Sequence, residues 1–294
     1  MAEPDWKVVQ HPLGYYEVQP KPSREELADY YARKYYQEGI GAYELDYTPD
    51  ELAHVRLKTS LIVRQVERLR AGPGRLLDIG CGEGWLLDRF RMAGWDVSGV
   101  DFSSFGVEKW NPELRDVVQT GDYEELLREA AAEGRTFDVV AFANVIEHVL
   151  DPRGLVRLAR DLVAPGGLLV IVAPNDFSPL HQRLLETGRI DEPFWVFHPD
   201  HLSYFNKASM EALLGAEAID VAAVVADNPI DLNLLNERMN YVREPEKGKS
   251  AHRYRIATDL FLAEQGEDAL LDLYAALGSM GVGRNLTYFC TVPK

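Results

Sequence analysis

The chain has 294 residues and a formal net charge of −16, with 46% hydrophobic and 27% charged residues. These totals are typical of a globular chain that forms one large domain or two modest ones. Neutralising a nucleic-acid backbone needs clustered Lys and Arg. The sequence has no basic run of that kind, so nucleic acid and anionic membranes are not expected as partners.

Cysteine content and hydropathy favour a cytoplasmic protein. The two cysteines, Cys81 and Cys290, are too few for a four-cysteine zinc site or a disulfide framework. Residues 1–10 lack the apolar core of a secretory signal. The sequence also lacks the run of about 18 apolar residues that a transmembrane helix needs.

The N-terminal part is predicted to form a helical lid over residues 1–70. Residues 1–22 are rich in proline and are expected to be irregular. A capping-box pattern at Ser23 predicts a helix that runs through Tyr36. A second helix is expected over about 48–70, where a proline stands at the first helical position and apolar residues recur every three or four positions.

From residue 71 onwards, apolar strands alternate with amphipathic helices. The expected strands are 75–79, 96–100, 117–120, 137–143 and 167–173, with helices over about 84–93 and 152–163. This alternation predicts an α/β fold with a parallel sheet, right-handed crossovers and helices on both faces. Strands that are apolar throughout fit burial on both faces of such a sheet.

The core domain is expected to span residues 71–294 and to carry two insertions. One covers about 176–205 and the other, mostly helical, about 229–280. Further elements are expected at 209–214 (helix), 221–226 (sixth strand) and 286–292 (last strand). Asn175 and Asp176, which follow the fifth strand, should face the pocket of a substrate that binds at this edge of the sheet.

A glycine-rich turn joins the first core strand to its helix. Residues 78–84 read Asp-Ile-Gly-Cys-Gly-Glu-Gly. Glycines let the backbone approach a ligand, and the helix N-terminus offers unpaired N–H groups. A dinucleotide fingerprint would need glycine where Trp85 stands. Asp78 brings nothing to a pyrophosphate but suits a ligand with an ammonium and a sulfonium. An ordinary tight turn is the alternative.

This turn resembles the first motif of class I S-adenosylmethionine-dependent methyltransferases of the small-molecule branch, types 11 and 23. The similarity covers about residues 71–175, including the Asn-Val-Ile-Glu-His-Val segment from 144 and the Leu-Val-Ala-Pro-Gly-Gly-Leu segment from 162. The His-Leu-Ser-Tyr-Phe segment from 201 extends it weakly. The resemblance implies a Rossmann-like, mostly parallel seven-stranded sheet with an antiparallel last strand, and S-adenosylmethionine as cofactor.

The resemblance also implies a set of cofactor-binding residues at the ends of successive strands. They are Asp78, Gly80, Cys81, Gly82 and Gly84 in the turn, Asp101 at the ribose hydroxyls, Phe102 at the adenine, Asp122 with Tyr123 at the adenine amino group, Asn144 at the methionine end, and Tyr36 from the N-terminal helix. Each outer position has a structural alternative. Asp101 would cap a helix, Asp122 would sit in a turn, and Phe102 and Tyr36 would pack in the core.

Two histidines are the candidate catalytic residues. Transfer of a methyl group to a hydroxyl needs a base, and His148 follows the fourth strand at the edge where ligands of open sheets bind. His201 lies in the first insertion, three residues after His198. A metal site is not expected, because no third ligand has convincing spacing. The alternative for His148 is a structural role, and Glu147 beside it would orient it or cap a helix.

The sequence thus predicts an enzyme that transfers a methyl group from S-adenosylmethionine to a small polar or carbohydrate-like acceptor, at oxygen. Two alternatives stay open: an N-methyltransferase acting on an amino sugar or another amine, and a non-catalytic binding protein with the same fold. The acceptor itself lies in loops that the fold does not determine. The oligomeric state is open between a monomer and a homodimer.

Overall fold

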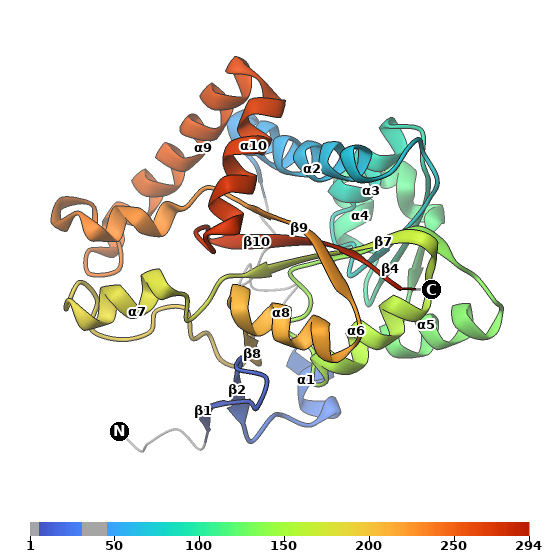
Figure 1. The fold of residues 1–294 in the computed structure, drawn as a ribbon, viewed down its shortest axis with the longest axis horizontal. Coiled ribbons are helices and arrows are strands. Elements are labelled where there is room, and N and C mark those ends of the chain that lie inside the picture. The colour runs from blue at the N-terminus through green and yellow to red at the C-terminus, as the bar shows by residue number, and fades with distance from the viewer. Residues whose placement is uncertain (1–5, 31–45, 294) are drawn as a thin grey trace.

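A seven-stranded sheet forms the centre of the computed structural model, which describes residues 6–30 and 46–293 (Figure 1). The strand order is β5-β4-β3-β6-β7-β10-β9. The strands β3 to β7 pair with one another in parallel, and β10 is antiparallel to both β7 and β9. The strands are β3 (Arg75–Ile79), β4 (Asp96–Asp101), β5 (Val118–Thr120), β6 (Phe137–Ala143), β7 (Val163–Pro174), β9 (Asp220–Ala226) and β10 (Asn285–Thr291). This arrangement confirms the predicted Rossmann-like fold with its antiparallel last strand.

Helices cover both faces of the sheet because the central strands are apolar on both sides. Successive residues of a strand point to opposite faces, and Leu76 and Leu77 accordingly lie in two different core clusters. One cluster includes residues of α5 (Tyr123–Ala132), α6 (Pro152–Asp161) and α8 (Lys207–Ala216). The other includes residues of α2 (Pro49–Leu69), α3 (Trp85–Met92) and α10 (Glu267–Ser279).

The region expected as a lid divides into different structures. The second helix, α2, begins at the capping box of Thr48 and Glu51, with proline in its first turn as predicted. Its Leu61 and Val66 are buried in the same cluster as Phe90 of α3, so α2 packs as a helix of the core. The first helix, α1, spans Arg24–Tyr30, and Tyr36 lies outside the described residues.

The expectation that residues 1–22 are irregular was wrong. Strands β1 (Lys7–Gln10) and β2 (Tyr16–Gln19) form an antiparallel hairpin, and β2 pairs in turn with β8 (Ser203–Tyr204). The ring of Tyr16 also stacks on Phe177, with centroids 4.1 Å apart. The hairpin therefore docks onto the first insertion, and its partner strand lies too far along the chain to leave a local signal in the sequence.

The two insertions lie beside the ends of β7 and β9. The first contains α7 (Pro179–Glu186), and the second contains three short 3-10 helices and α9 (Gly248–Gln265) ahead of α10. The 3-10 helices are η3 (Ile230–Leu235), η4 (Glu237–Met239) and η5 (Pro245–Lys247); α4 (Phe105–Trp110) and η2 (Pro112–Val117) join β4 to β5.

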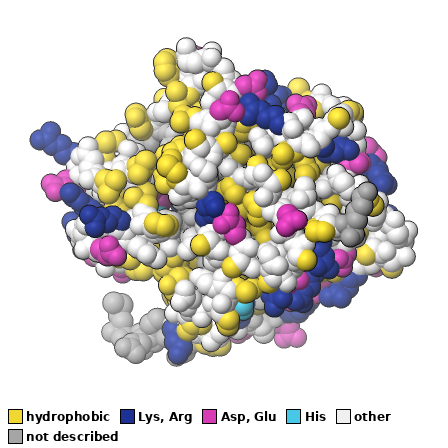
Figure 2. All heavy atoms as spheres, viewed as in Figure 1, with side chains coloured by type: hydrophobic (Ala, Val, Ile, Leu, Met, Phe, Trp, Pro, Cys, Tyr) yellow, Lys and Arg dark blue, Asp and Glu magenta, His cyan; other side chains and the backbone are white. Residues whose placement is uncertain are grey.

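On the face shown in Figure 2, basic and acidic side chains are interspersed, mostly toward the edge of the view. Within the described part of the chain, no helix has the length and hydropathy to cross a membrane.

Candidate active site

The glycine-rich turn after β3 has the backbone geometry that only glycine adopts without strain. Gly80, Gly82 and Gly84 have φ angles of 70°, 54° and 79°, in the left-handed region. A Cβ at Gly80 would also lie 2.5 Å from Cγ2 of Val145, in the segment after β6. The turn therefore lies close against the neighbouring strand end, and it opens directly into α3.

Asp78 is buried near the end of β3, just before this turn. Its side chain is 2% exposed. Burial and the charge of Asp101 together raise the pKa of Asp78 to about 8. A bound cation would restore the charged carboxylate, because an opposite charge nearby lowers the pKa of an acid. The position therefore fits the ammonium of an amino-acid ligand better than it fits a phosphate.

Asp101 ends the adjacent strand β4 and faces the same turn. Its Oδ2 atom accepts a hydrogen bond of 2.8 Å from the Gly82 amide, and its Oδ1 atom accepts one of 3.0 Å from the Ser103 amide. A carboxylate oxygen can accept more than one hydrogen bond, so this residue type suits ligand hydroxyls. The next residue, Phe102, is 46% exposed, so it is not the core residue that the alternative interpretation required.

Cys81 contributes main-chain atoms to the turn and its side chain to the core. Its side chain is 8% exposed and packs in the cluster that includes α2 and α3. Its amide donates to the Val100 carbonyl at 3.2 Å. Burial raises the pKa of the thiol, so the side chain stays a neutral apolar group.

The structure gives Asp122 a capping role. Its Oδ1 atom accepts hydrogen bonds from the amides of Glu124 and Glu125, at 2.8 and 3.4 Å, and so caps α5. Tyr123 packs against the core cluster under α5 and α6. Asn144 directly follows β6, has a φ of 54° and is exposed. The contacts that these three residues make to a cofactor stay predictions.

All these residues meet because the parallel strands end at one edge of the sheet. The chain order reverses between β3 and β6, which are neighbours in the sheet. In open α/β sheets, ligands bind at the carboxyl ends of the strands at such a switch point. The segment that follows β6 therefore adjoins the glycine-rich turn, and it carries Glu147 and His148.

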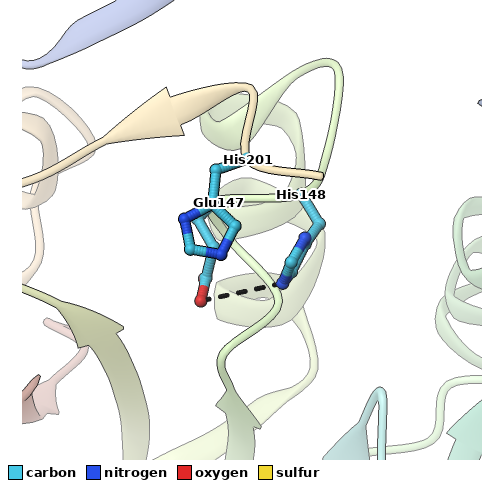
Figure 3. A group of neighbouring side chains, drawn as sticks. All are labelled: Glu147, His148 and His201. Atoms are coloured by element: carbon cyan, nitrogen blue, oxygen red, sulfur yellow. Dashed lines mark ion pairs between the residues drawn. The ribbon is translucent and has the colours of Figure 1, made fainter. Parts of the chain in front are cut away.

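His148 and His201 lie side by side with Glu147 (Figure 3). The two imidazole rings meet edge to face, with centroids 4.8 Å apart. One ligand atom from each of the three side chains lies within 4.8 Å of the others. The spacing of the sequence showed no third ligand to go with two histidines, and the fold brings Glu147 to His148 and His201. His198 lies outside this group and stacks on Trp6. The absence of a metal stays a prediction.

The surroundings of His148 define its tautomer. Its Nδ1 atom lies 2.7 Å from the Asp200 carbonyl oxygen, which can only accept. Nδ1 therefore carries a proton, and Nε2 lies 3.8 Å from a Glu147 oxygen. Burial raises the pKa of Glu147 to about 7. Burial, with the charges of His148 and Arg284, lowers the pKa of His201 to about 3.

A second polar cluster adjoins this group at the end of β7, and the sequence indicated only parts of it. Nη1 of Arg284 donates to Oδ1 of Asp176 at 2.7 Å. Asp231 accepts from the Tyr241 hydroxyl at 2.5 Å and lies 2.8 Å from Nε2 of His181. Asp176 was expected at this edge, but its partner Arg284 stands just before β10, more than a hundred residues away, and the sequence does not align the two.

Comparison with known proteins places this site in a family. The model of a methyltransferase domain matches residues 52–218. The ubiquinone biosynthesis O-methyltransferase of Ralstonia nicotianae is 39% identical over 111 residues, which are 37% of this chain and 44% of the relative. The enzyme of the same name from Caulobacter sp. (strain K31) is 32% identical over 168 residues, which are 53% and 64% of the two chains. The chain thus spans about half the length of these curated relatives.

Two solved structures illustrate the similarity at greater distance. The magnesium protoporphyrin IX methyltransferase of Synechocystis PCC 6803 is 18% identical and has a TM-score of 0.47, covering 69% of this chain and 92% of that one. A S-adenosylmethionine-dependent methyltransferase of Clostridium acetobutylicum is 10% identical with a TM-score of 0.48, covering 92% and 99%.

The chain is a member of the methyltransferase domain family, because the family model matches more than half of its length. This family uses S-adenosylmethionine as its methyl donor. The glycine-rich turn, Asp78 and Asp101 agree with that cofactor in chemistry and in position.

Proposed function

We propose that the protein transfers the methyl group of S-adenosylmethionine to an oxygen atom of a small, polar, carbohydrate-like acceptor. The observation that carries this proposal is the position of His148 after β6, beside the cofactor turn, with its Nδ1 proton held by the Asp200 carbonyl. The two curated relatives named above are O-methyltransferases, which supports oxygen as the acceptor atom.

The chain's own residues fit this reaction in three ways. S-adenosylmethionine supplies an activated methyl group when it is bound. The turn and Asp78 receive its amino-acid end, and Asp101 receives its ribose. Nε2 of His148 would accept the proton of the acceptor hydroxyl as that oxygen takes the methyl group, whose bond to the cofactor sulfur breaks to release S-adenosylhomocysteine. Glu147, close to Nε2, stabilises the resulting imidazolium when its carboxylate is charged. Asp122, Asn144 and Tyr36 are further proposed contacts of the cofactor.

His201 is proposed as the second catalytic histidine, which shields His148 from water and orients the acceptor. Its low pKa keeps the ring neutral, so it does not repel a protonated His148. Neutral imidazole can also accept a hydrogen bond from the acceptor. If both single variants, His148→Ala and His201→Ala, retain full turnover, a histidine base is excluded and a nitrogen acceptor becomes the better candidate.

Calorimetric titration tests the first step. The protein should bind S-adenosylmethionine and its demethylated product, S-adenosylhomocysteine. No heat of binding at about millimolar cofactor would contradict the enzymatic function. Turnover is then measured as formation of the demethylated product with a panel of hydroxylated and aminated small molecules, and mass spectrometry identifies the atom that carries the methyl group.

A further inference from the structure

Buried polar atoms without a protein hydrogen-bond partner gather at one place in the described part of the chain, the ends of β6 and β7 with the first insertion. They include Glu147 Oε2, Asn175 Oδ1, Asp176 Oδ2, Asp200 Oδ1, His201 Nδ1 and Ser203 Oγ. Glu147, Asn175 and Asp176 are at most 2% exposed. A buried polar atom without a partner costs stability unless a ligand or water pairs with it, so this concentration marks a binding region.

These atoms are mostly hydrogen-bond acceptors. The oxygen of Asn175 is assigned by its own contacts, because Nδ2 donates to the carbonyls of Gly281 and Gly283 at 2.9 and 3.1 Å. Main-chain hydrogen bonds join the Ser203 amide to the Glu147 carbonyl at 3.1 Å and the Asp176 amide to the Phe205 carbonyl at 2.6 Å, so the segment 203–205 connects the two acidic residues. A ligand that satisfies this region must therefore bring N–H or O–H donors.

Arg284 does not make the net charge of this region positive. Its Nη1 atom pairs with Asp176, and its Nε atom lies 4.0 Å from Asp231, so one guanidinium faces two carboxylates. Asp176 keeps one oxygen, Oδ2, for another donor. A ligand carboxylate would meet these acidic groups with like charge, which disfavours its binding.

A divalent cation at Glu147, His148 and His201 is the competing occupant. The three ligand atoms are close enough to be considered. However, one ion reaches ligands only within about 2.0 to 2.6 Å, and it would leave Asn175 and Asp176, at the end of the neighbouring strand, without a donor. The charge of Arg284, which acts on His201, also opposes a second cation there. An extended organic ligand, by contrast, can form hydrogen bonds with Glu147 and with Asn175 and Asp176 at the same time.

We propose that the methyl acceptor is anchored through hydroxyl or ammonium groups on Asp176 and Glu147, and that the site discriminates against acceptors that carry a carboxylate. This inference rests on the proposed function, and it specifies the acceptor class: a polyol or an amino alcohol, of which an amino sugar is an example. Asp176 is the residue that determines this specificity.

Three monosaccharides of the same ring size test the proposal: glucosamine, glucose and glucuronate. Their binding is measured by saturation-transfer NMR and calorimetry at about pH 8, where a carboxyl group with a pKa near 7 is charged, with and without S-adenosylhomocysteine. Glucosamine or glucose should bind at least about tenfold more tightly than glucuronate, because a charged hydrogen bond replaces a like-charge contact.

Two variants distinguish a loss of acceptor binding from a loss of folding. Asp176→Asn should abolish most of the preference over glucuronate, and Glu147→Gln should reduce it independently, with circular dichroism confirming that each variant is folded. Asp161→Asn is the matched control, since Asp161 pairs with Arg160 at the surface, and it should leave the preference unchanged.

The other outcomes overturn the proposal. Equal or tighter binding of glucuronate, or no binding of any of the three sugars at about 100 mM, contradicts it. Binding of Zn²⁺ or Mg²⁺ that His201→Ala removes, together with sugar binding that disappears in EDTA, would assign the region to a cation instead. Binding of S-adenosylhomocysteine is measured separately, so a failure of the cofactor site is distinguished from a failure of the acceptor anchor.

Discussion

The Asp101 carboxylate accepts a 2.8 Å hydrogen bond from the Gly82 amide, which joins the end of β4 to the turn after β3. The same carboxylate accepts from the Ser103 amide at its other oxygen. It is therefore held in one orientation by the main chain of its own strand end and of the adjacent turn. A residue that is oriented before its ligand arrives loses little freedom on binding.

Replacement of Asp101 should weaken cofactor binding more than it weakens folding. Asp101→Ala removes the proposed acceptor for the ribose hydroxyls, and we expect the dissociation constant of S-adenosylmethionine to rise about ten- to a hundredfold. Asp101→Asn keeps one acceptor oxygen and should show a smaller loss. Calorimetry measures both constants. An unchanged constant for the alanine variant would show that Asp101 does not contact the cofactor.

Cofactor affinity should depend on pH through Asp78. Its pKa is raised to about 8 by burial and by Asp101, so the unliganded protein must release a proton from Asp78 before the carboxylate can pair with an ammonium. Affinity should therefore increase by up to about tenfold per pH unit below pH 8 and level off above it. Titrations in buffers of different ionisation enthalpy measure the released proton, and Asp78→Asn should eliminate the dependence.

The proposed catalytic role of His148 predicts a change in turnover and not in cofactor binding. His148→Ala should lower kcat by about 10² to 10⁴, while the dissociation constant of S-adenosylhomocysteine stays the same. His148→Gln is a matched variant that retains polarity without a titratable nitrogen. Equal turnover of the wild type and both variants would refute general-base catalysis by this residue.

Two glycines with the same backbone conformation allow the packing of the turn to be measured. Gly80 and Gly72 both have φ angles of 70°, but only Gly80 has a neighbour, Val145, in the space that a Cβ would occupy. Gly72→Ala should cost about 1 kcal/mol of unfolding free energy for the backbone strain. Gly80→Ala should cost about 1 to 3 kcal/mol more because of the overpacking. Urea denaturation of both variants measures the difference.

Glu147 should make the stability depend on pH with a defined sign. Its pKa is about 7 in the folded protein, above the ordinary value of 4.5, so the folded state binds the proton more tightly than the unfolded chain does. Relative to Glu147→Gln, the wild type should therefore lose stability as the pH rises from about 4.5 to 7, by a total of about 3 kcal/mol. Parallel slopes for the two proteins would show that Glu147 is not buried in the unliganded state.

The strands of the core and the cofactor turn could be predicted because their signals are local. The apolar runs in β3, β6 and β7 are long and uninterrupted, and the spacing from Asp78 to Gly84 is contained in one turn. Asp101 could be located because it ends the next strand of the same motif. In each case the residues that determine the structure are close together in the sequence.

The rest of the site depends on contacts between distant segments. The position of His201 beside Glu147 results from the folding back of the first insertion. The pairing of Asp176 with Arg284 results from the antiparallel register of β10 on β7, which aligns Asn285 with Pro174. Asp122 illustrates a different limit, because a helix cap and a ligand contact require the same residue type at the same position.

The pairing of β2 with β8 has a consequence for the order in which the protein is made. A ribosome releases the N-terminal hairpin long before it releases Ser203 and Tyr204, so the hairpin waits for its third strand while residues 20–202 are synthesised. The strands β3 to β7, which pair with one another, can form meanwhile. The pairing of β2 with β8, next to His201, is consequently a late step of folding, since contacts of high sequence separation form slowly.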